Sequence, residues 1–215
     1  MPQESKIKTG DVVELKSGGP HMTVVCIENH NIVCQWFYGR LIESTFMLET
    51  LNVAPEEYQR HKAIGLRLKA GDVVCLASGG PHMTVSSCQD SKVTCQWFDQ
   101  GLLSQDTLMH ATLSLVSAKQ TRLQSEMDNV AVGDVVRLNS GRKDMTVSHI
   151  SDLRIVCQWF VDHTLHEGAF THGTLLSPAD LKRIDQEDKD RRRRALMEEE
   201  ANRDHSDELD YGFVD

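Results

Sequence analysis

Short runs of β-branched and aromatic residues, separated by Gly, Pro and Asn, predict a series of β-strands along the chain. The first runs are Asp11–Leu15, Met22–Val25 and Ile32–Phe37. A more hydrophilic stretch and a closing segment at Thr50 follow. Four or five such strands in about 45 residues predict a small β-barrel of the SH3-like kind, because a short sheet hides its apolar face best by curling.

The same pattern occurs three times. The copies start at Gly10, Gly71 and Gly133, with a period of about 61 residues, which is longer than the period of common solenoid repeats. Each copy is therefore predicted to be a self-contained, mainly β unit. In all copies an apolar residue precedes a closing Thr-Leu pair, at Phe46 and Thr50, Leu108 and Thr112, and Phe170 and Thr174.

The predicted organisation is three tandem barrels, joined by short helices and followed by a charged helix and a tail. A core as small as one barrel's is marginally stable alone, so we expect the units to pack on one another. Helix signals follow each unit, such as Ser177 as an N-cap before Pro178. The predicted ranges are barrels at 8–54, 69–116 and 131–177, helical linkers at 55–68 and 117–130, a charged helix at 178–202 and an acidic, disordered tail at 203–215.

The turn between the first two strands of each unit is a candidate binding loop. "SGGPHMTV" occurs at 17–24 and 78–85, and the third copy has "SGRKDMTV" at 140–147. Glycine before proline favours a tight hairpin with positive φ, and the same loop could instead contact a partner. The candidate residues are Gly18, Gly19, Pro20, His21, Gly79, Gly80, Pro81, His82, Arg142 and Lys143.

A Cys-Gln-Trp-Phe block is the second shared feature. Side chains alternate along a strand, so Cys and Trp face one side and Gln and Phe face the other. We expect the Cys and Trp side chains to form the core, namely Cys34, Trp36, Cys95, Trp97, Cys157 and Trp159. The outward Phe37, Phe98 and Phe160 would then form a contact surface or pack between repeats. If the faces are reversed, Trp becomes the binding aromatic.

The C-terminal segment has a different composition. Arg191–Arg194 and Glu198–Glu200 are spaced for salt links on a helix. The acidic tail that follows carries Tyr211 and Phe213. These aromatics belong either to a solvated, disordered end or to a short motif that docks into a partner.

Charge and cysteine usage restrict the function classes. A net charge of −9 over 215 residues disfavours a broad surface for nucleic-acid phosphates. Six cysteines are divided two, three and one among the copies, which is not the pattern of a repeated disulfide framework. No signal segment and no apolar run long enough to span a membrane is evident. We therefore expect a cytoplasmic protein without membrane contact.

The "GDVV.LKSGGP.MTV" block, followed by "V.CQWF" and a later "TL", resembles the YodC-like family of uncharacterised small bacterial proteins. The resemblance covers residues 8–53, 69–116 and 131–177. It implies a compact β unit of bacterial or phage origin and assigns no catalytic residue. Three copies with a charged tail depart from the single copy typical of the family, and Arg142-Lys143-Asp144 departs from its turn.

Candidate chemistry is sparse. Neither C-x-x-C nor H-x-x-x-H metal-ligand spacing occurs, so no metal or cofactor is expected. The shared cysteines lie in strand centres, which favours structural thiols over nucleophiles. The glycine turn leads into a strand and offers no helix N-terminus to a phosphate. The sequence predicts a protein that is not an enzyme.

The sequence favours a multivalent binding or adaptor protein with a protein partner, because repeated weak sites on one chain raise avidity. One alternative is a nucleic-acid-binding or ribosome-binding protein, with a salt-dependent basic stripe. Another is a small-ligand (nucleotide) sponge with pockets between barrels. The candidate basic stripe comprises Lys16, Arg40, Arg142, Lys143 and Arg154.

Overall fold

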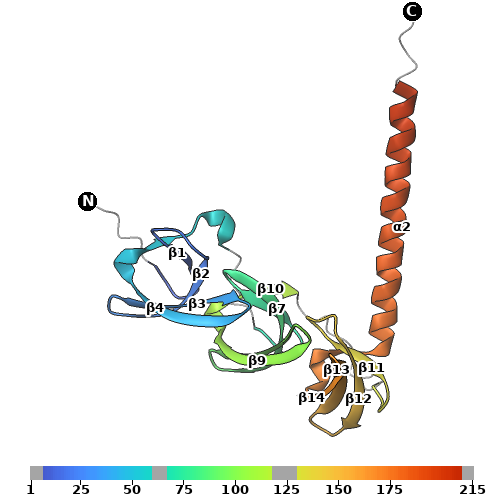
Figure 1. The fold of residues 1–215 in the computed structure, drawn as a ribbon, viewed down its shortest axis with the longest axis horizontal. Helices are drawn as coiled ribbons and strands as arrows, with labels where there is room; N and C mark the ends of the chain where they lie inside the picture. The colour runs from blue at the N-terminus through green and yellow to red at the C-terminus, as the bar shows by residue number, and fades with distance from the viewer. Residues whose placement is uncertain (1–6, 60–66, 118–129, 210–215) are drawn as a thin grey trace, which may run out of the picture.

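The computed structural model describes residues 7–59, 67–117 and 130–209, with side chains up to residue 199. Each repeat forms one five-stranded antiparallel sheet, and the three sheets follow one another in a row from the N-terminus (Figure 1). The mainly β class and the three repeated units are therefore confirmed. Among the described residues, no pairing joins the two edge strands of a sheet, so the sheets are open and not closed barrels.

The strands have closely matching bounds in the three repeats. The first sheet contains β1 Val12–Leu15, β2 Met22–Glu28, β3 Asn31–Tyr38, β4 Arg40–Met47 and β5 Leu51–Val53. The second contains β6 Val73–Leu76, β7 Gly79–Gln89, β8 Lys92–Asp99, β9 Leu102–Met109 and β10 Leu113–Ser117. The third contains β11 Val135–Leu138, β12 Asp144–Ile150, β13 Ile155–Val161, β14 Thr164–Phe170 and β15 Leu175–Leu176.

Each sheet is a meander of four strands whose fifth strand returns to pair with the first, in the order β4-β3-β2-β1-β5 for the first repeat. The hydrophilic stretch after the Trp-Phe pair is itself a full strand, β4 in the first repeat. A 3₁₀ turn before the last strand reverses the chain. The closing Thr of each repeat stabilises this turn, because its hydroxyl donates to the carbonyl three residues earlier, at Thr50, Thr112 and Thr174.

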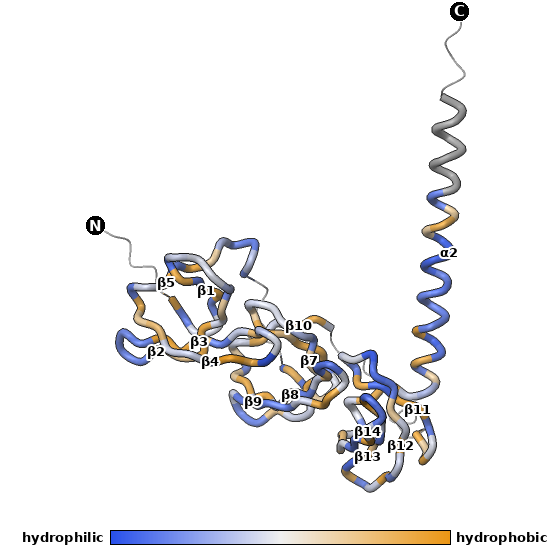
Figure 2. The backbone as a smooth tube through the Cα atoms, viewed as in Figure 1, coloured by the Kyte–Doolittle hydropathy of each residue, from blue (hydrophilic) through white to orange (hydrophobic). Residues whose placement is uncertain are grey.

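Each sheet bends around its own small apolar core. Hydrophobic and hydrophilic positions alternate along the strands (Figure 2), and the buried apolar residues of each repeat form one cluster. Cys34, Cys95 and Cys157 are fully buried in the three cores, and Trp97 and Trp159 are 6% and 4% exposed. Trp36, at the equivalent place in the first repeat, is only half-buried.

The predicted helical linkers are described only in part. Glu56–Tyr58 forms a single 3₁₀ turn at the start of the first linker, and Ser117 still belongs to β10. The remaining linker residues, 60–66 and 118–129, lie outside the described residues.

One long helix, α2 Pro178–Leu209, follows the third sheet and projects away from it (Figure 1). It begins as predicted: Asp180 accepts hydrogen bonds from the backbone N–H and hydroxyl of Ser177 at 3.0 and 2.9 Å. Its predicted end at residue 202 is wrong, and residues 203–209 of the expected disordered tail are helical. The chain contains no Gly or Pro between Pro178 and Gly212 to stop the helix earlier.

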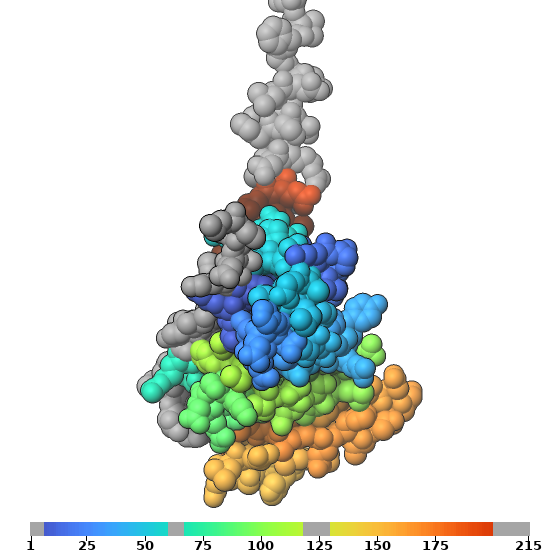
Figure 3. Space-filling model, turned by 90° about the vertical axis from the view of Figure 1, so that its left-hand side faces the viewer, coloured from blue at the N-terminus to red at the C-terminus, as the bar shows by residue number. Residues whose placement is uncertain are grey.

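The repeats pack directly on one another, as successive layers in the space-filling view (Figure 3). Phe37 of the first repeat meets Trp97 of the second edge-to-face, with ring centroids 5.7 Å apart. Phe98 meets Trp159 of the third repeat in the same way, at 5.3 Å. The contact between the first and second repeats and the contact between the second and third therefore use the same Phe and Trp positions of the repeat.

Hydrogen bonds also repeat between these layers. Thr23 donates its hydroxyl to Ser78 Oγ at 2.8 Å, and the Ser78 backbone N–H donates back to Thr23 Oγ1 at 2.8 Å. Thr84 and Ser140 form the same reciprocal pair at 2.7 and 2.9 Å. The serine is the first residue of the repeated turn, so this turn takes part in the contact between repeats.

The glycines of the turn serve both conformation and contact. Gly79 and Gly80 have φ of 103° and 114°, a conformation that favours glycine. A Cβ added at Gly80 would lie 2.4 Å from the Phe37 ring. Gly19, its counterpart in the first repeat, has φ of 134° and nothing within 4 Å of the added Cβ. The two positions therefore differ in whether a neighbouring repeat fills the space.

This difference gives a matched pair of variants. Gly19→Ala and Gly80→Ala both introduce backbone strain of about 1–3 kcal/mol. Gly80→Ala also displaces Phe37, which we expect to lower the free energy of unfolding by roughly a further 1–3 kcal/mol. Urea denaturation of the two variants measures the difference. Equal destabilisation would show that Phe37 does not pack closely on the turn in solution.

Candidate interaction surface

Each repeat presents two different faces to its neighbours. We call the side that enters the next repeat the docking face. In the first repeat it consists of Val12, Thr23, Phe37 and Leu41: Phe37 and Leu41 pack against the second core, and Val12 clusters with Ala77. The equivalent residues by strand pairing are Val73, Thr84, Phe98 and Leu103 in the second repeat and Val135, Thr146, Phe160 and Leu165 in the third.

The opposite side of each unit is the receiving face, formed by the Ser-Gly turn and the Trp. It comprises Ser78, Gly80 and Trp97 in the second repeat and Ser140, Gly141 and Trp159 in the third. The second contact has an additional hydrogen bond, from Trp159 Nε1 to the Gly101 carbonyl at 2.9 Å. The Trp is thus a core residue that also meets the preceding repeat.

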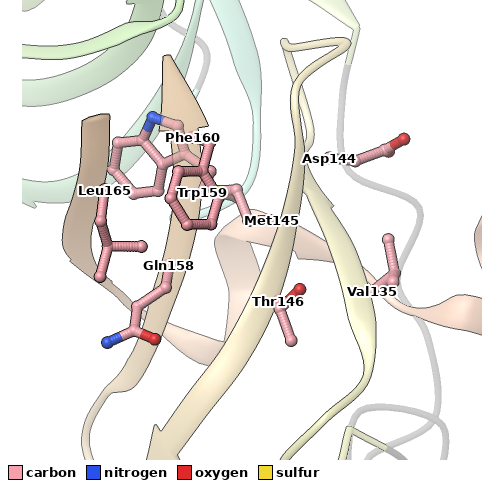
Figure 4. A pocket seen from close by; sticks show the side chains of 8 residues that line it. All are labelled: Val135, Asp144, Met145, Thr146, Gln158, Trp159, Phe160 and Leu165. Carbon is pink, nitrogen blue, oxygen red and sulfur yellow. The ribbon is translucent and has the colours of Figure 1, made fainter. Parts of the chain in front are cut away.

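The docking face of the third repeat is uncovered. Phe160 is 62% exposed, Leu165 54% and Val135 46%, and Thr146 is exposed as well. The corresponding Thr23 and Thr84 are fully buried. In Figure 4 the side chains of the third repeat's docking face line a surface hollow of about 330 Å³. An apolar face that is buried twice within the chain is therefore left open at its C-terminal sheet.

Polar groups surround this hollow. Asp144 forms an ion pair with Arg137, and this hydrogen bond raises the pKa of the arginine. Lys143 Nζ donates to the Phe160 carbonyl at 2.7 Å. Gln158 Nε2 donates to Glu167 at 2.9 Å. An apolar centre with a polar rim of both charge signs is typical of a protein-binding surface.

The predicted binding aromatics have different environments. Phe37 and Phe98 pack between repeats, which was one of the two uses expected of the outward Phe, and Phe160 is free to contact a partner. Tyr211 and Phe213 lie outside the described residues.

The predicted turn residues also divide. Three of them lie beside the first repeat, namely Gly79, Gly80 and Pro81. Five are exposed, namely Gly18, Gly19, Pro20, His82 and Arg142. His21 is 3.5 Å from a Glu14 carboxylate oxygen and packs on the Tyr58 ring at 4.1 Å. Lys143 is held by the Phe160 carbonyl. The turn therefore shapes the receiving face, and Lys143 of the third copy borders the docking face at Phe160.

Burial makes the shared cysteines poor nucleophiles. Removal from solvent raises the pKa of Cys34, Cys95 and Cys157 to about 12. All six cysteines are free thiols. In the described part of the chain, no cluster of His, Cys, Asp or Glu has the arrangement of a metal site. The same residues include no helix that is long and apolar enough to span a bilayer.

Sequence reasoning missed Val135, Thr146 and Leu165. The signal was present, because Leu41, Leu103 and Leu165 each pair with the Phe of their repeat, although the first hairpin is one residue shorter than the other two. Aligning the three repeats by their paired strand residues would have shown that each has a Phe-Leu pair on one face of its sheet. Such an alignment requires the register of the hairpin.

Phe37 and Phe160 occupy equivalent positions and provide a direct comparison. We expect Phe37→Ala to lower the free energy of unfolding by about 1–3 kcal/mol, because it removes a partly buried aromatic contact with Trp97. Phe160→Ala should change it by less than about 0.5 kcal/mol, as for an exposed surface residue. Chemical denaturation of both variants checks this. A large loss for Phe160→Ala would mean that its face is already covered within the chain.

The matched family model is described as "Uncharacterized small protein (DUF2158)", and it covers residues 8–51, 69–113 and 131–175. None of the curated proteins matches the chain. The predicted resemblance to an uncharacterised small-protein family in three copies is confirmed at this level, and the YodC-like name stays a prediction. The chain belongs to the DUF2158 family of uncharacterized small proteins and carries the family's unit three times in tandem.

Proposed function

We propose that this protein is a non-enzymatic adaptor that binds a protein partner through the docking face of its third repeat. One observation carries the proposal: the Val and Thr side chains that are buried, and the Phe and Leu side chains that are partly buried, at both internal contacts are exposed at the third. Phe160 and Leu165 provide an apolar contact of the kind that anchors protein interfaces.

The internal contacts support this choice of site. A Phe and a Leu from one sheet already pack on a neighbouring core in the first repeat, so the face is suited to a folded protein surface. The sequence suggested a weak binding site that is repeated along the chain. Two of these faces hold the array together, so the proposal assigns external binding to the third copy alone.

Charge supports a protein partner over a nucleic acid. The net charge is −9, and two basic residues near the face are engaged locally: Arg137 pairs with Asp144, and Lys143 donates to a backbone carbonyl. A net acidic chain disfavours binding to nucleic-acid phosphates.

We also infer finer features of the fold and its setting. A four-stranded meander followed by a 3₁₀ turn and a strand that returns to β1 fits a partly open, SH3-like unit. Buried free thiols suit a reducing cytoplasm. The family resemblance suggests a bacterial or phage accessory protein.

A comparative pull-down tests the function. The baits are the tagged wild type, the double variant Phe160→Asp/Leu165→Asp, and Leu153→Asp as a control, since Leu153 is 80% exposed in the β12–β13 turn at the other end of β13. The lysate comes from source cells that lack the gene for this chain, so that captured proteins are not second copies. Nuclease treatment and washes at low and high salt separate protein partners from nucleic acid.

We expect a stoichiometric protein on the wild type and on Leu153→Asp, and at least a tenfold loss on the double variant, because two charges in the apolar centre remain unpaired on binding. Equal recovery on all three baits would contradict the proposed site. Recovery that disappears with nuclease or salt would instead support the nucleic-acid alternative. Circular dichroism of each bait verifies that its fold is intact.

A further inference from the structure

We propose that the docking face of the third repeat binds the receiving face of the first repeat in a second copy of the chain, so that copies assemble head to tail. This inference rests on the proposed function, since it gives the same face a second occupant, another copy of the chain, besides the external partner. Phe160 would then meet Trp36 of the next copy as Phe37 meets Trp97 within the chain.

The receiving face of the first repeat is open. Trp36 is half-buried, whereas Trp97 and Trp159, which a preceding repeat covers, are buried. Ser17 is exposed, and a Cβ added at Gly18 or Gly19 meets nothing within 4 Å. At the equivalent place in the second repeat, the Phe37 ring fills this space.

The turn of the open face has glycine φ angles close to those of the occupied turn. The turn sequence is identical in the first and second repeats, "SGGPHMTV". Gly18 and Gly19 have φ of 86° and 134°, and their counterparts Gly79 and Gly80 have 103° and 114°. The first repeat therefore holds its two turn glycines at similar φ angles without a neighbour to impose them, and binding requires little change of these angles.

The partner residues match one by one. Val135, Thr146, Phe160 and Leu165 are the same residue types as Val12, Thr23, Phe37 and Leu41. Thr146 would pair with Ser17 as Thr23 pairs with Ser78.

One position of the receiving face differs between the repeats. Lys16 takes the place of Ala77 and Asn139. Asn139 Nδ2 donates to the Gly71 carbonyl at 2.8 Å across the second contact. The Lys16 ammonium can donate to the Gly133 carbonyl in the same manner, and its alkyl stem can pack on Val135 as Ala77 packs with Val12.

The rest of the described chain leaves the docking face accessible. The helix α2 contacts β11 and β15, yet Val135 on β11 is still about half exposed. The first and third repeats lie at opposite ends of the row (Figure 1), so one copy does not satisfy its own two faces. A contact between two different faces does not close on itself as a two-fold contact does, so association continues into longer assemblies or a ring.

Analytical ultracentrifugation over about 1 µM to about 1 mM tests the inference, since an untethered copy of this contact lacks the effective concentration that the linkers provide. The weight-average mass of the wild type should rise with concentration beyond that of a dimer. Phe160→Asp removes the docking face, and Ser17→Arg blocks the receiving face. Each variant alone should stay monomeric, and Leu153→Asp should associate like the wild type.

Mixing the two blocked variants is the decisive step. Ser17→Arg keeps an intact docking face and Phe160→Asp an intact receiving face, so an equimolar mixture should form a dimer and nothing larger. A wild type that stays monomeric throughout would overturn the inference, as would association that survives Phe160→Asp or a mixture that stays monomeric. If the wild type is monomeric and the double variant still loses its partner in the pull-down, the inference fails and the proposed function stands; if neither assay responds to Phe160, both fail.

Discussion

The edge-to-face packing of a Phe from one repeat on the Trp of the next is the interaction on which the rest of this structure depends. A five-stranded sheet of this size encloses few apolar side chains, and its Trp lies where the core opens toward the preceding repeat. Where a preceding repeat supplies a Phe, the Trp is buried; the first repeat has no predecessor, and Trp36 is half-buried. The three cores are thus small separately, and the second and third are completed by the repeat that precedes each.

Because the two contacting faces differ, every array of such units has two unlike ends. One end is the turn and Trp36 of the first repeat, and the other is Phe160 with its apolar neighbours on the third. The proposed adaptor function and the proposed head-to-tail assembly both follow from this polarity. The divergent third turn still receives the second repeat through Ser140 and Gly141, and its Lys143 donates to the Phe160 carbonyl beside the uncovered face.

Much of the fold was predictable because each repeat carries its own strand pattern. The alternation in Cys-Gln-Trp-Phe indicated the buried cysteines, and Ser177 with Pro178 indicated the start of the helix. The uncovered surface was not predictable, because Phe37, Phe98 and Phe160 each end an identical Cys-Gln-Trp-Phe block, and this block does not show whether another sheet covers the Phe. Leu165 was missed since its role depends on hairpin register, and the helix end was missed because charge density suggested disorder where no residue stops the helix.

A double-mutant cycle between Phe37 and Trp97 tests the central claim most directly. Phe37→Ala and Trp97→Leu would be measured singly and together by chemical denaturation, with Phe160→Ala and Trp97→Leu as the control cycle. We predict a coupling free energy of about 0.5–1.5 kcal/mol for the first pair, as for aromatic rings in contact. The control pair should be additive within about 0.5 kcal/mol. Additivity of Phe37 and Trp97 would contradict the account, because the repeats would then be held together by something other than this contact.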